Sequence, residues 1–141
     1  MTLLLAVHLA LAAGYAGVQW TVRGLVYPQF GLVPASAFPA FHEGHSRRIA
    51  WIVGPLFAGQ LTTTTWLLLD RPAGTPLAAV LTGAGCLAVV LLVTGLVAVP
   101  QHRRLGGGRD PVAYRRLLRT DTVRSVAAGG SLLAALWVAA S

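Results

Sequence analysis

Histidine, arginine and acidic side chains gather in two short segments of an otherwise apolar chain. Residues 41–48 and 101–124 hold three of the four histidines, three of the four acids and nine of the eleven arginines. A tenth arginine, Arg23, closes the first apolar stretch. Histidine changes charge near neutral pH, and an arginine stabilises anions that form in a reaction. We therefore expect any chemistry of this protein where these two segments meet.

The histidines have the spacing of a metal-ligand set. His42 and His45 are three residues apart and share one face of a helix, and His102 adds a distant third imidazole. Such a set suits iron, copper or zinc, with Glu43 or Asp121 as an acceptor for the second ring nitrogen. The same residues would equally serve metal-free acid–base catalysis or substrate binding, or a structural network. The sequence leaves these alternatives open.

Asp121 and Arg124 are also three residues apart, and nearly unbroken apolar sequence follows Arg124. An arginine at the centre of a bilayer costs about 2.5 to 3.5 kcal/mol on insertion scales, so Arg124 needs a partner such as Asp121 or Glu43. It is either an arginine that reaches toward the headgroups while paired with Asp121, or a residue that binds substrate or orders a catalytic site.

Two further polar residues are candidates for contact with a substrate. Arg48 continues the helical face of His42 and His45. Gln60 lies deep in the second apolar stretch, where its amide forms an interhelical hydrogen bond or a polar contact in a cavity.

The composition predicts an all-α integral membrane protein. Only 11% of the 141 residues are charged and 55% are apolar, whereas soluble domains carry about 25% charged residues. A helix needs about 20 apolar residues to cross a bilayer, and four stretches provide them. We expect a single-domain four-helix bundle with spans at 2–26, 48–69, 76–99 and 121–140.

The positions of the arginines predict the topology. Basic residues concentrate in cytoplasmic loops, so segments 27–47 and 100–120 should face the cytoplasm, and both termini should lie outside a plasma or inner membrane. Three prolines between residues 28 and 41 predict an interfacial segment, and residues 111–119 predict a short amphipathic helix at the interface. Because the arginines flank apolar spans, the partner is the bilayer and no nucleic acid is expected.

Residues within the spans predict close packing. Small residues in the first, third and fourth spans let helices approach each other, in a monomeric bundle or a homo-oligomer. The lone Cys86 cannot form an intramolecular disulfide and is expected to be a small core residue. His8 has no histidine partner on its side of the membrane and should form a buried hydrogen bond.

Two motifs carry a family resemblance: Val99-Pro100-Gln101-His102-Arg103-Arg104-Leu105 after the third span, and Asp121-Thr122-Val123-Arg124 at the start of the fourth. With four spans, the chain resembles the anthrone-oxygenase-like family of small membrane proteins, most clearly over residues 93–140. The resemblance implies oxidation of a lipophilic aromatic molecule by dioxygen, with His102, Asp121 and Arg124 as site residues. This chain has His102 and Asp121 where the family has asparagines, so a metal-free mechanism does not carry over directly.

These observations predict a membrane-embedded, oxygen-dependent oxidoreductase for a lipophilic or aromatic small molecule. His102, Asp121 and Arg124 are its predicted catalytic residues, Arg48 and Gln60 contact substrate, and His42, His45 and His102 hold iron or copper if a metal is used. The alternative is a non-enzymatic transporter or membrane scaffold subunit. Small proton-coupled transporters generally place an acid in the middle of a span, and here all four acids lie near span ends or in loops.

Overall fold

Four long helices make up the protein. The structure, a computed structural model, describes residues 2–141, and these contain helices and turns but no strand. The first long helix consists of α1 (Leu3–Thr21), the π-helical segment η1 (Val22–Val26) and α2 (Tyr27–Phe30). The second is α3 (Phe38–Leu69), the third joins α4 (Leu77–Val93), η2 (Thr94–Ala98) and α5 (Val99–Gly106), and the fourth is α6 (Pro111–Ala139).

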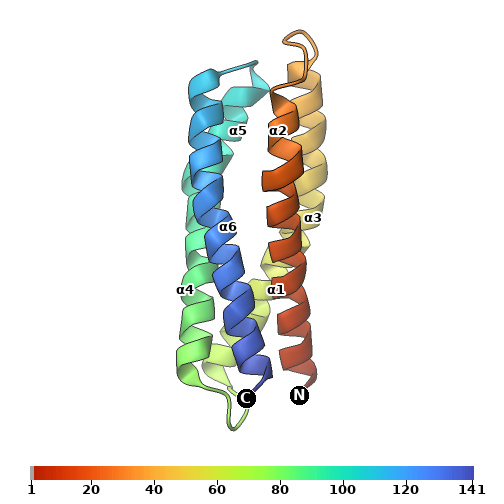
Figure 1. The fold of residues 1–141 in the computed structure, drawn as a ribbon. Coiled ribbons are helices and arrows are strands. Elements are labelled where there is room, and N and C mark those ends of the chain that lie inside the picture. The colour runs from red at the N-terminus through yellow and green to blue at the C-terminus, as the bar shows by residue number, and fades with distance from the viewer. Residues whose placement is uncertain (1) are drawn as a thin grey trace.

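Each long helix is apolar and long enough to cross a membrane, as the composition predicts. Figure 1 shows both termini at one end of the bundle, and the connections from α2 to α3 and from α5 to α6 at the other. The two basic segments therefore meet at one end. The side of the membrane that this end faces stays a prediction.

Two prolines are built into helices through π-helical turns. A proline has no N–H, and its ring collides with the carbonyl four residues before it. Just ahead of Pro28 and Pro100, the helix widens so that Tyr27 N–H donates to Val22 O and Val99 N–H donates to Thr94 O, five residues back. The first and third helices thus continue to Phe30 and Gly106, beyond the predicted span ends at 26 and 99.

The fourth helix is longer than its predicted span. Residues 111–119, expected as a separate interfacial helix, are the first turns of α6. Asp110 caps this helix, because its carboxylate accepts from Val112 N at 2.9 Å and Ala113 N at 3.0 Å. These hydrogen bonds, first the one from Ala113, lower the pKa of Asp110. Pro111 occupies the first turn, where no N–H is needed.

Small residues bring the helices together, as expected. A methyl group on Gly83 would touch the Cβ atom of Ala134 at 3.4 Å, and one on Gly130 would lie 2.9 Å from Cys86 Sγ, so α4 and α6 are in close contact. Near the termini, α1 and α3 are joined by a hydrogen bond of 2.9 Å between His8 Nδ1 and Thr63 Oγ1. This is the buried bond expected of His8.

We predict that Gly130→Ala is less stable than Gly129→Ala by about 1 kcal/mol, because the added methyl group overpacks the contact with Cys86. Gly129→Ala is the matched control, since its methyl group would meet nothing within 4 Å. Thermal unfolding in detergent measures both. Adding Cys86→Ala should restore the Gly130→Ala variant; equal melting temperatures for the two glycine variants would contradict the packing.

Candidate functional site

A cavity of about 500 Å³ lies at the end of the bundle that carries the basic connections. Its wall comes from all four long helices and is mainly apolar, with aliphatic side chains and Phe57 toward the middle of the bundle. Its polar side chains include Gln19, Tyr27, His42, Glu43, His45, Ser46, Thr94, His102, Arg103 and Arg124. The two segments predicted to meet therefore share one cavity.

Asp121 lies fully buried beside this cavity and is the centre of a hydrogen-bond cluster. Its Oδ1 accepts from Gln19 Nε2 at 2.5 Å and from an Arg124 terminal nitrogen at 2.8 Å. Gln19 in turn accepts from the Tyr15 hydroxyl at 3.0 Å. The carboxylate thus joins α6 to α1 and neutralises Arg124 in a place where an unpaired charge would be costly.

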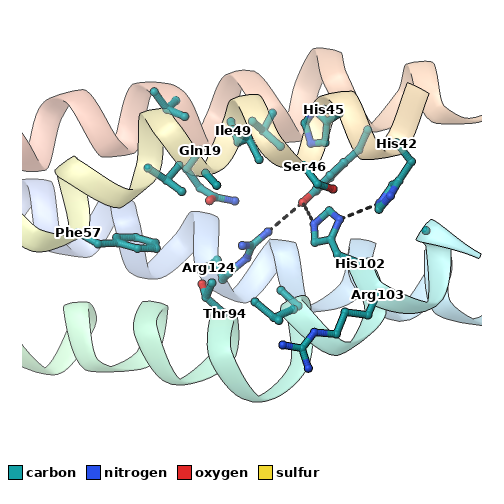
Figure 2. A pocket seen from close by; sticks show the side chains of 18 of the residues that line it. Gln19, His42, His45, Ser46, Ile49, Phe57, Thr94, His102, Arg103 and Arg124 are labelled. Carbon is teal, nitrogen blue, oxygen red and sulfur yellow. Dashed lines mark hydrogen bonds between the residues drawn. The ribbon is translucent and has the colours of Figure 1, made fainter. Parts of the chain in front are cut away.

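The hydrogen-bond network continues from Arg124 to the histidines. The same terminal nitrogen donates to the Tyr27 hydroxyl at 3.1 Å, and that hydroxyl lies 3.4 Å from His102 Nε2. His102 Nδ1 lies 3.0 Å from His42 Nε2. Figure 2 follows these contacts from Arg124 to His42. One chain of polar contacts therefore runs from a buried carboxylate to a pair of imidazoles.

The donor groups fix the direction of the hydrogen bonds from Arg124 to His42. Arginine can only donate, so the Tyr27 oxygen accepts from Arg124 and its own proton points to His102 Nε2. A neutral His102 then carries its proton on Nδ1 and donates to His42 Nε2. The distance of 3.4 Å between Tyr27 and His102 is long for a hydrogen bond between O and N, so this link is the weakest in the chain.

The π-helical segments place two of these side chains. Tyr27 directly follows η1 and His102 lies in the first turn of α5, directly after η2. An additional residue in a helical turn rotates everything beyond it, which is why such segments are frequent at functional sites. Val22, Thr94 and Ala98 in these segments also line the cavity.

The structure brings together most of the predicted site. His42, His102, Asp121 and Arg124 are in one network, and His45 lines the same cavity, with its ring centroid 6.2 Å from that of His102. Arg124 does not reach outward to the headgroups, because it is 7% exposed and its guanidinium donates inward. The predicted pairing of Arg124 with Asp121 is confirmed.

Arg48 and Gln60 lie elsewhere. Arg48 lines a separate hollow between α3 and the first helix, beside Phe41 and Ile52. Gln60 is 1% exposed, does not line the cavity, and its Nε2 has no hydrogen-bond partner among residues 2–141. The expected interhelical bond from that nitrogen is therefore not formed. Helical spacing put Arg48 with the site, and a polar side chain within an apolar span suggested Gln60. Arg48 lies on another side of α3, and Gln60 lies beyond Phe57, the last α3 residue in the cavity wall.

Sequence reasoning missed Tyr27, Gln19 and Thr94. A signal existed for Gln19, because an amide within an apolar span is the feature that singled out Gln60. Tyr27 directly follows the first predicted span, and nothing in the sequence indicates that its hydroxyl connects Arg124 to His102. No sequence pattern distinguishes Thr94 from the other span threonines.

The three histidines approach each other, but residues 2–141 contain no group of three or more His, Cys, Asp or Glu side chains placed to hold a metal ion. His42 and His102 contact each other directly instead. Ligation of iron or copper by His42, His45 and His102 stays a prediction, and the function proposed below does not depend on it.

Comparison with protein-family models, with curated proteins and with solved structures gave no significant match. The resemblance to the anthrone-oxygenase-like family therefore stays an expectation from the two motifs.

We predict that Asp121→Leu destabilises the bundle by about 3 to 5 kcal/mol, because it leaves the Arg124 charge buried without its carboxylate. The double variant Asp121→Leu/Arg124→Met removes both charges and should regain most of that loss. Thermal unfolding in detergent measures this. A double variant as unstable as the single one would contradict a stabilising role for the pair.

Proposed function

We propose that the protein is a membrane-embedded oxidoreductase that binds a lipophilic small molecule in this cavity and oxidises it with dioxygen. The observation that carries the proposal is the chain from Asp121 through Arg124 and Tyr27 to His102, which borders a largely apolar cavity of about 500 Å³. Apolar pockets with a few converging polar groups are the usual form of small-molecule sites.

Polar atoms without partners support a ligand that carries polar groups. Ser46 Oγ, Thr94 Oγ1 and Arg124 Nε are buried in the cavity wall and have no hydrogen-bond partner among residues 2–141. Thr82, on the same long helix as Thr94, donates to the carbonyl four residues earlier, so Thr94 departs from the ordinary pattern. A bound molecule with oxygen atoms would satisfy these groups, which otherwise lose the energy of a hydrogen bond.

The network is suited to moving a proton. With Nε2 of His102 unprotonated, the Tyr27 oxygen takes a proton from an acidic C–H or O–H group of the substrate while its own hydroxyl proton passes to His102 Nε2. Arg124 lines the cavity and stabilises the enolate or phenolate that forms. Asp121 and Gln19 hold Arg124 in place.

Oxidation then follows from the carbanion character of that anion. Dioxygen adds to the deprotonated carbon of a methylene group, and loss of one water gives a carbonyl group. The balance is one methylene carbon and one dioxygen consumed for one ketone and one water formed. Dioxygen dissolves in the apolar cavity, and the substrate supplies all the electrons. The family resemblance names anthrones as one class of molecule with such a methylene group.

A transport function is less well supported. At the end near the termini, Leu5, Leu67, Ala79, Val80 and Val138 form a packed apolar cluster, and none of them lines the cavity. A transport path through the bundle would have to pass this cluster.

The test is aerobic turnover of anthrone by the purified protein in liposomes, with oxygen uptake and quinone formation measured together. We expect a 1:1 ratio, and a loss of about 10²-fold or more in kcat for His102→Ala and Arg124→Ala. Arg47→Gln, which removes an exposed charge at the same end, is the matched control and should keep its rate. Full activity in both site variants would refute the proposal.

The same preparation tests the metal prediction. Metal analysis that finds one iron or copper per chain, lost in His42→Ala and in His45→Ala, would support ligation by the histidines. Metal-free protein with full turnover would rule it out.

A further inference from the structure

A second hollow, of about 450 Å³, lies between α1 and α6 and is separate from the cavity. Its lining residues come from η1 and the end of α1 on one side and from α6 on the other: Trp20, Arg23, Gly24, Leu118, Arg119 and Thr122. We call it the α1–α6 groove. None of these six residues lines the cavity of the candidate site.

The groove carries two positive charges and no acid. Arg119 is exposed and forms no hydrogen bond or salt bridge within residues 2–141. Arg23 has one such contact, from its NH1 atom to Asp121 Oδ2 at 3.6 Å, and its side chain is 33% exposed. Asp121 itself is already paired with Arg124. The groove therefore offers a site to an anion.

The groove also lies where a bilayer changes from headgroups to acyl chains. On α6, the exposed residues before Thr122 include Arg115, Arg116 and Arg119, whereas those after it are apolar, such as Val126 and Leu133. Trp20 is 52% exposed and lies one helical turn from Arg23, on the apolar side. Tryptophan prefers this boundary.

We propose that the α1–α6 groove binds the phosphate of an anionic phospholipid. Arg23 and Arg119 flank the phosphate, and Trp20 packs against the first part of an acyl chain. At Gly24 an added methyl group would meet no atom within 4 Å, so no side chain fills this part of the groove. Basic pockets between membrane helices bind such headgroups. This site does not depend on the function proposed for the cavity.

Quenching of tryptophan fluorescence by phospholipids with brominated acyl chains tests the groove. The protein is placed in vesicles of phosphatidylcholine with a fixed fraction of brominated lipid, either phosphatidylglycerol or phosphatidylcholine. We expect stronger quenching by brominated phosphatidylglycerol. Trp20→Phe should remove this difference, because Trp20 is the tryptophan in the groove.

Charge variants decide whether the groove or the general positive charge selects the lipid. Arg119→Gln should weaken the preference for phosphatidylglycerol about fivefold, the effect of one basic residue near anionic lipid. Arg47→Gln removes an exposed charge from α3 at the same end and should leave the preference unchanged. Equal effects of the two variants, or a preference that survives Trp20→Phe, would overturn the proposal.

Free phosphate is the other source of the same chemistry. Inorganic phosphate at tens of millimolar should not release the lipid beyond the effect of chloride at equal ionic strength. If phosphate restores the fluorescence in a way that chloride does not, the groove is a site for free phosphate and the lipid proposal fails.

Discussion

The buried pair of Asp121 and Arg124 is the interaction on which the rest of this end of the bundle depends. Both residues lie on α6, three positions apart, and their charges are held 2.8 Å from each other inside the protein. Placing a charge there is costly, so the pair is maintained only while further hydrogen bonds satisfy it. Gln19 provides one from α1, and the Tyr27 hydroxyl accepts one from Arg124. The elements α1 and α2 of the first long helix are thereby joined to α6 through the same ion pair.

The two π-helical segments, η1 and η2, also contribute to the arrangement of the site. The wide turns ahead of Pro28 and Pro100 accommodate rings that lack an N–H and crowd the carbonyl four residues before them. Tyr27 and His102 follow these turns, so the turns that accommodate the prolines also orient two side chains of the site.

The sequence was sufficient for the architecture because hydrophobic length and the clustering of arginine are properties of the chain itself. It also identified Asp121 and Arg124, since an arginine followed by apolar residues needs a nearby carboxylate. It failed for helix ends, because the prolines suggested ends before Pro28 and Pro100, whereas widened turns carry both helices past them. Residues 111–119 also run directly into the fourth span and do not form a separate helix. It did not show that Arg48 and Gln60 lie outside the cavity wall, because neither helical spacing nor polarity within a span tells which neighbour a side chain meets.

Tyr27 links the Asp121–Arg124 ion pair to the imidazoles at the cavity, so the proposed proton transfer depends on this one hydroxyl. The most direct measurement is ¹⁵N NMR of histidine-labelled protein in bilayers, wild type against Tyr27→Phe. If Tyr27 connects Arg124 to His102, the variant shifts the Nε2 resonance of His102, while His8, bonded to Thr63 at the other end, stays unchanged. An unchanged His102 resonance would show that the two halves of the network are not joined, and would contradict the account.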